Sequence, residues 1–234
     1  MASSNPRYRA VYGLVVVPSF VVAVLMAALY LVVMPLVPMV GHYYFSQQAQ
    51  TYATYQVPLL IHIGAGAVAL VLGPINLIGA LRRTPGRRHR TIGKFYAVAV
   101  SVAATGAIFM SFHAYPGTIA NGQIIVTSGF FLLGVAWLVT LGLAVRAIAV
   151  KHDIAAHRFW IIANFSLTFV AVVLRAETAV ILATGTFETL YPFLPWTSGV
   201  PNLIIAMVLA RKLNRQRARR TRRPRQPSLT NQNP

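Results

Sequence analysis

The chain has 234 residues, of which 56% are hydrophobic and only 10% are charged, and its formal net charge is +18 at neutral pH. So few charged side chains cannot cover a soluble globule of this length, so the composition predicts a protein that crosses a membrane several times. The sequence has no cysteine, which excludes disulfide bonds, thiolate metal sites and cysteine nucleophiles.

The predicted fold is all-α, a polytopic membrane helical bundle with six transmembrane helices. Residues 1–10 form a short polar head, and the six apolar runs lie at about residues 11–33, 57–81, 94–115, 123–149, 159–184 and 196–210. No cleavage pattern follows the first run, so we expect it to be retained as a helix. Between the spans, residues 41–56 and 187–197 read as aromatic loops suited to the membrane interface. Residues 211–234 form a basic tail that we expect to be disordered beyond its first helical turns.

Basic residues are distributed unevenly along the chain. All but one of the 21 lysine and arginine residues fall in the head, the second and fourth inter-span loops and the tail, which six spans place on one side. Under the positive-inside rule, both termini are therefore cytoplasmic. We expect the tail to bind anionic lipid headgroups, at about 1 kcal/mol per basic residue near the surface. Nucleic acid is an unlikely partner, because no aromatic stacking motif accompanies the arginines.

The exception is Arg175, which lies inside the fifth predicted span. On a helix it shares a polar-to-small stripe with His157, Trp160, Asn164 and Thr168. The stripe rises about 27 Å between His157 and Arg175, close to the roughly 30 Å hydrocarbon core of a bilayer. An arginine inside a span marks a functional site by default, the alternative being a residue that only ties helices together. Glu177 does not pair with it along the helix, because two residues turn the chain by about 200°.

Two groups of histidines accompany this stripe. His62 and His113 are predicted near the outer ends of the second and third spans, at similar depth and in the same half as Arg175. His89 and His157 form a second group at the cytoplasmic boundary, each followed by arginine. The alternative for the second group is that both His-Arg pairs only anchor helix ends in the headgroup layer.

Bis-imidazole ligation of a b-type haem fits the first group best. It needs two histidines at one depth, small residues beside the porphyrin and cations for the propionates, and His62, His113 and Arg175 with Gly66 and Gly106 meet that list. His89 and His157 make a looser second site. A zinc hydrolase or a proton-coupled transporter would need more intramembrane carboxylates than this chain has, and serine or glycosidase chemistry lacks its acidic partners.

Several separated motifs agree in order with a known family. These are His62 ahead of Gly73-Pro74, His89-Arg90 with Gly93 and Tyr96, His157-Arg158 with Trp160, and Leu167-Thr168-Phe169 before Arg175. In this combination the chain resembles, over about residues 57–210, the predicted bacterial membrane proteins of domain of unknown function 2306. Lys94 stands where the family pattern has arginine, and Ile161 where it has methionine. The resemblance implies a multi-pass helical protein of the bacterial cell membrane and assigns no reaction.

Two functional hypotheses follow. The first is a membrane redox protein or subunit that holds haem b between its helices and exchanges electrons with a quinone-like molecule or a redox partner. The second is a non-catalytic scaffold that binds lipid or a protein partner, in which the histidines and Arg175 make structural hydrogen bonds. Whether the protein is an enzyme stays open, as do its substrate and oligomeric state.

Overall fold

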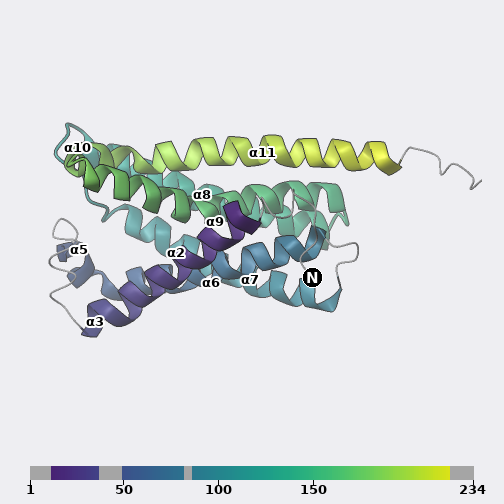
Figure 1. Ribbon diagram of the computed structural model, residues 1–234, viewed down its shortest axis with the longest axis horizontal. Coiled ribbons are helices and arrows are strands. Elements are labelled where there is room, and N and C mark those ends of the chain that lie inside the picture. The colour runs from purple at the N-terminus through teal and green to yellow at the C-terminus, as the bar shows by residue number, and fades with distance from the viewer. Residues whose placement is uncertain (1–11, 37–48, 82–85, 222–234) are drawn as a thin grey trace, which may run out of the picture.

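The computed structural model describes residues 12–36, 49–81 and 86–221. Every regular element in this part of the chain is a helix, and six helical segments are long and apolar enough to cross a membrane. Figure 1 shows them as one elongated bundle, in which α11 runs along the upper edge and α2 crosses the lower helices obliquely. The predicted all-α bundle of six spans is therefore confirmed.

The first span is a continuous run of helical turns, from η1 (Tyr12–Val16) through α2 (Val17–Ala27) and η2 (Ala28–Val33) to α3 (Met34–Leu36). The second and third spans are α6 (Gln56–Leu81), preceded by the short α5 (Ala49–Thr54), and α7 (Arg87–Ser111). The remaining elements are α8 (Gly122–Ala149), α9 (Ile154–Ala183), α10 (Phe187–Leu190), η4 (Tyr191–Phe193) and α11 (Leu194–Thr221).

Several predicted boundaries differ from those of the helices. The loop predicted at residues 187–197 is helical, divided among α10, η4 and the first turn of α11. The third span begins at Arg87 instead of residue 94, because Gly86 is extended and the helix starts directly after it. Part of the loop predicted at residues 41–56 is helical from Ala49 onward, whereas residues 41–48 lie outside the described part. The sixth span continues to Thr221, so the first residues of the predicted tail are helical. The head and residues 222–234 also lie outside the described residues.

The basic extension of α11 is docked onto the start of α9. The side-chain amide of Asn214 donates to the carbonyl oxygen of Ala155 at 2.9 Å and accepts from the guanidinium of Arg158 at 2.9 Å. The guanidinium of Arg211 lies 5.8 Å from the centre of the Phe159 ring, a cation–π distance. These contacts with α9 stabilise the helical conformation of α11 beyond its apolar residues.

Glycines allow the helices to approach closely where large side chains cross between them. A Cβ atom at Gly73 of α6 would lie 2.4 Å from the ring of Phe165 on α9. A Cβ atom at Gly134 of α8 would lie 2.6 Å from the side chain of Ile108 on α7. Helices in a membrane associate mainly through such tight contacts, because lipid tails are as apolar as the side chains.

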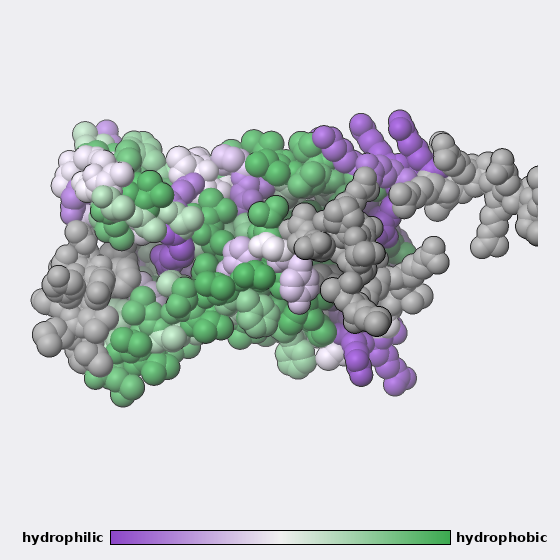
Figure 2. All heavy atoms as spheres, viewed as in Figure 1, coloured by the Kyte–Doolittle hydropathy of each residue, from purple (hydrophilic) through white to green (hydrophobic). Residues whose placement is uncertain are grey.

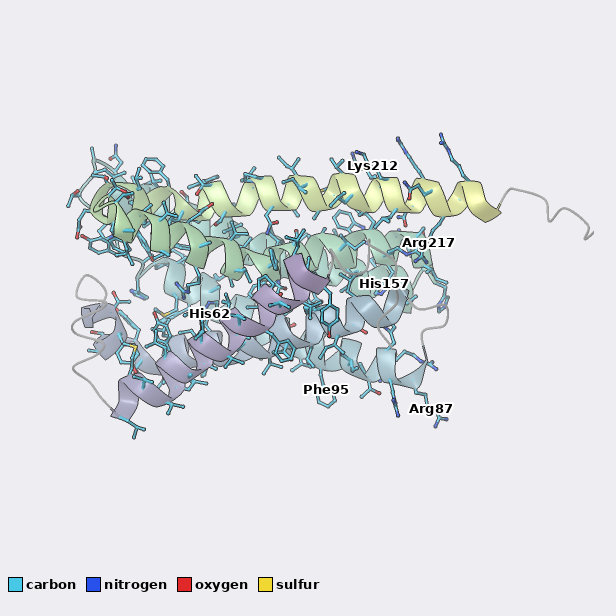
Figure 3. All side chains as sticks on the ribbon, in the orientation of Figure 1. His62, Arg87, Phe95, His157, Lys212 and Arg217 are labelled. Atoms are coloured by element: carbon cyan, nitrogen blue, oxygen red, sulfur yellow. The ribbon has the colours of Figure 1, made fainter. Side chains whose placement is uncertain are left out.

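Basic side chains gather at one end of the bundle, which we call the basic end. Figure 2 shows hydrophilic residues concentrated there, and Figure 3 places Arg87, Lys212 and Arg217 at that end. The other end, with α5 and α10, is the opposite end. This clustering agrees with the charge pattern on which the predicted orientation rests. That the basic end is cytoplasmic, and that it binds anionic headgroups, stay predictions.

Because the chain has no cysteine, single-cysteine labelling can test the orientation. Lys212 is exposed at the basic end and Thr189 is exposed at the opposite end. In intact cells we expect a membrane-impermeant maleimide to label Thr189→Cys, and to label Lys212→Cys only after permeabilisation. The reverse pattern would mean that the positive-inside rule orients this chain wrongly.

Candidate functional site

A buried hydrogen-bond network joins α7, α8 and α9 in the middle of the bundle. The hydroxyl of Tyr96 donates to Asn164 Oδ1 at 2.8 Å and lies 2.9 Å from Thr168 Oγ1. The indole of Trp137 donates to Thr168 Oγ1 at 3.0 Å, and Asn164 Nδ2 donates to the Trp137 carbonyl at 2.7 Å and to Thr140 Oγ1 at 3.0 Å. Asn164 is 0% exposed and Thr168 2%. Asn164 and Thr168, in the middle of the polar stripe on α9, therefore have a structural role, because they join α9 to α7 and α8.

A cavity of about 260 Å³ lies between α2, α6, α7, α8 and α9, toward the opposite end. We call it the membrane cavity. Its walls are mainly apolar, and its volume is just below the roughly 300–1,000 Å³ that is usual for pockets that hold small molecules. The three outer residues predicted from the sequence all line it. Its polar lining comprises Tyr30, Thr51, Tyr52, His62, Ser111, His113, Tyr115, Trp137, Thr168, Arg175 and Tyr191.

Arg175 has a weak partner in this cavity. Its Nε–H donates to the thioether sulfur of Met26 at 3.0 Å, and this is its one hydrogen bond within the described residues. A thioether is a poor acceptor, and it leaves the remaining four N–H groups of the guanidinium unbonded to described residues. Arg175 is partly buried and lines the cavity, and its described partner is a sulfur atom and not the anion that the sequence predicts.

The three acidic residues of the chain are all engaged elsewhere. Asp153 caps α9 by accepting from the backbone of Ala155 and Ala156, each at 2.9 Å. Glu177 accepts from a threonine on α11 at 2.9 Å, and Glu188 accepts from the hydroxyl of Tyr115. No acidic side chain of this protein therefore neutralises the charge of Arg175.

His62 is held by α7. Its Nδ1 lies 2.7 Å from the carbonyl oxygen of Ala103, so Nδ1 carries the proton and donates. In a neutral imidazole, Nε2 then has a lone pair, and it makes no hydrogen bond with any described residue. A Cβ atom at Gly106 would lie only 3.0 Å from the Cβ of His62, so α6 and α7 are in close contact there. Gly66 differs, because a Cβ atom added to it meets nothing within 4 Å.

The predicted haem arrangement at His62 and His113 does not fit this geometry. His113 follows the end of α7, seven residues beyond Gly106, and its ring stacks on Tyr55 with centroids 3.8 Å apart. Tyr55 in turn precedes His62 by seven residues on an antiparallel neighbour, so His113 lies about 10 Å nearer the opposite end than His62. The two imidazoles are not at one depth. Gly106 packs on His62 and leaves no space for a porphyrin between the two helices.

The loop after α7 is tied to α10 at the opposite end. The backbone N–H of Thr118 donates to the carbonyl of Glu188 at 2.8 Å, and the Tyr115 hydroxyl donates to the carboxylate of the same residue. That hydrogen bond raises the pKa of Tyr115 to about 12. Gly117 has a φ of +68°, and a Cβ atom there would meet the Glu188 carbonyl. Tyr115 lines the cavity, so these contacts fix part of its wall.

The inner histidines occupy matching positions on α7 and α9. Tyr96 and Asn164 are hydrogen-bonded across α7 and α9, which both start at the basic end. His89 and His157 each lie seven residues earlier, two helical turns and about 20° away, so they occupy matching positions. They are close enough to interact electrostatically. His157 Nδ1 donates to the carbonyl of Ala144 at 2.8 Å.

Two buried polar atoms near the inner histidines have no partner in the described part of the chain, Nδ1 of His89 and Oδ1 of Asn76. Nearby, Arg158 donates to Asn214 on α11, and the headgroup anchoring considered for the His-Arg pairs stays a prediction. No cluster of three or more His, Cys, Asp or Glu side chains is found among the described residues. The inner group thus combines one arginine that links α9 to α11 with two imidazoles that are incompletely bonded.

Sequence reasoning missed the contribution of the first span. Met26 and Tyr30 line the cavity, and Met26 is the hydrogen-bond partner of Arg175. Neither residue stands out in an apolar run, because methionine and tyrosine are ordinary members of a transmembrane helix. The missing signal was the packing partner of Arg175, which sequence periodicity does not supply.

Comparison with known proteins identifies a family and nothing beyond it. The family described as "Predicted membrane protein (DUF2306)" matches residues 59–210. No curated protein and no solved structure matches the chain.

The central network should contribute measurably to stability. We expect Asn164→Leu to cost about 2 kcal/mol, because it leaves buried partners unsatisfied, and to lower the Tm by roughly 4–8 °C for a chain of this length. Thermal unfolding in detergent measures this. Thr105→Val is the control, since Thr105 is exposed and bonds only within its own helix. Equal Tm values for the two variants would contradict a structural role for the network.

Proposed function

The chain belongs to the DUF2306 family of predicted membrane proteins, and we propose that it holds a lipophilic small molecule in the membrane cavity. The observation that carries this proposal is the cavity itself, about 260 Å³ within a bundle of transmembrane helices and lined by His62 and Arg175. An arginine inside a span is costly without a good partner, and within the described chain Arg175 bonds only to the thioether of Met26. A bound molecule would supply a better partner.

The apolar part of the lining supports a lipophilic ligand. Residues from α2, α6 and α9, such as Val22, Leu70 and Leu174, provide aliphatic walls beside the polar groups. Such a mixture of a mainly apolar wall and a few polar groups is typical of small-molecule sites. The proposal is a sharper form of the lipid-binding alternative drawn from the sequence, and it leaves open whether the bound molecule is transformed.

Haem b is a second candidate ligand, and the inner histidines, His89 and His157, suit it better than the outer pair, His62 and His113. His89 and His157 occupy matching positions on α7 and α9 and interact electrostatically, and Nδ1 of His89 is buried without a described partner. His157 Nδ1 is oriented by a backbone carbonyl, as is usual for iron-ligating histidines, which leaves Nε2 available. Arg87, Arg88 and Arg90 would offer cations to the propionates. A haem there would supply one-electron chemistry, with a quinone-like molecule as the electron partner.

Two glycines on α6 provide a matched test of the cavity. A Cβ atom added to Gly64 or to Gly66 meets nothing within 4 Å, but only Gly66 lines the cavity. We therefore expect Gly66→Leu to fill the cavity and abolish ligand binding, and Gly64→Leu to bind as the parent does. Both variants should assemble with the same helicity by circular dichroism.

Trp137 provides the readout, because it lines the cavity. In a parent protein with Trp160→Phe and Trp196→Phe, Trp137 is the remaining tryptophan of the three in the chain. Long-chain brominated amphiphiles should quench its fluorescence saturably in detergent or nanodiscs. We would abandon the proposal if a brominated acid, the brominated alcohol of equal length and the corresponding alkyl phosphate all failed to quench saturably, or if Gly66→Leu bound as Gly64→Leu does.

The haem candidate predicts a different pattern. Protein purified after expression with ample haem should show a Soret band with a reduced-minus-oxidised shift. His89→Ala or His157→Ala should remove most of the low-spin signal, because each loses one axial ligand, while His62→Ala should keep it. A colourless parent protein with intact helicity would eliminate this candidate and leave the cavity proposal unaffected.

A further inference from the structure

We propose that the molecule held in the membrane cavity is an amphiphile with an anionic head, a carboxylate or a phosphate, which pairs with Arg175. This inference rests on the proposed function and names the class of its ligand. Charge provides the first argument. The guanidinium lies within a transmembrane helix, and the three acidic residues of the chain are all engaged away from it. An arginine is protonated at any physiological pH, so its counter-anion has to come from outside the chain.

The geometry of Arg175 provides the second argument. A structural arginine that ties helices together satisfies its donors with carboxylates or backbone carbonyls. Arg175 bonds instead to the sulfur of Met26 through Nε, which leaves both terminal nitrogens without a described partner. These two nitrogens form the planar fork that matches two oxygens of a carboxylate or phosphate. The contact with Met26 holds the side chain in the cavity without consuming that fork.

The remainder of the cavity specifies an amphiphile and not a small soluble anion. Its walls beyond Arg175 are mainly aliphatic and aromatic, and the helices around it belong to the membrane-spanning part of the chain. His62 adds an acceptor, because its Nε2 lone pair has no described partner. A hydroxyl on the ligand, or a protonated phosphate oxygen, would donate to it. The combination is that of a long-chain acid whose head lies between Arg175 and His62.

Comparison of an acid with its alcohol tests the charge directly. The probes are a brominated long-chain fatty acid, the alcohol of the same length and the corresponding alkyl phosphate, each titrated against Trp137 fluorescence. We expect the parent protein to bind one or both anions about ten- to a hundredfold more tightly than the alcohol, the size expected for a hydrogen-bonded charge pair. The acid and phosphate arms distinguish the two head groups.

Variants at Arg175 assign that preference to one side chain. Arg175→Gln should remove the preference for the anion and leave the affinity for the alcohol unchanged, while Arg175→Lys should retain part of it as a point charge. Arg219→Gln is the matched control, because it removes a charge at the basic end and should change neither affinity.

Equal affinity of the parent protein for the alcohol and for both anions would overturn this inference, and would leave the proposed function standing because the probes still bind. If Arg175→Gln still bound the anions more tightly than the alcohol, the inference would likewise be overturned and the proposed function would stand. Absence of saturable binding by all three probes would overturn both. Comparison of the two anions with the alcohol needs no variant at all, so it decides the question even if Arg175→Gln fails to fold.

Discussion

The hydroxyl of Tyr96 joins two side chains of α9, Asn164 and Thr168, and the rest of the bundle is arranged around this junction. In lipid there is no water to replace a missing partner, so a polar group at this depth is either bonded inside the protein or expensive. Here the donors and acceptors are matched through Trp137 and Thr140 on α8. The network fixes the register of α7, α8 and α9, and that register determines where every other polar side chain of these helices lies.

Polar groups are less completely matched on either side of this network. Toward the opposite end, Arg175 bonds to a thioether and His62 has an unused ring nitrogen. Toward the basic end, His89 and Asn76 each have a buried atom without a described partner. The contrast within one chain is informative, because the same helices satisfy asparagine, threonine, tyrosine and tryptophan fully in the middle. Incomplete bonding at the two ends is therefore better explained by a role in binding than by poor packing.

Scarcity of acidic residues gives the chain its distinctive electrostatics. With 21 basic and only three acidic side chains, most positive charge has to be balanced by something other than the protein. At the basic end, water and lipid headgroups can do so. In the membrane cavity neither is an easy partner, so a single arginine there carries more information about a ligand than the whole basic tail does. The membrane cavity, and not the tail, is thus the more specific feature of the molecule.

The sequence by itself determined the class, the number of spans and the separation of charge, because apolar run length and basic blocks are local properties of the chain. It also identified His62, His113 and Arg175 as a group, and these residues do line one cavity. Only the tertiary structure decided how they are arranged. The predicted span ends place His113 at the level of His62, but the third helix starts at Arg87 and ends before His113, so this histidine lies nearer the opposite end. Three features depend on which helices are neighbours and in which register. They are the hydrogen bond from Arg175 to Met26, the close packing of Gly106 on His62, and the matching positions of His89 and His157. Periodicity along one helix does not contain that information, because it is set by side-chain packing between helices.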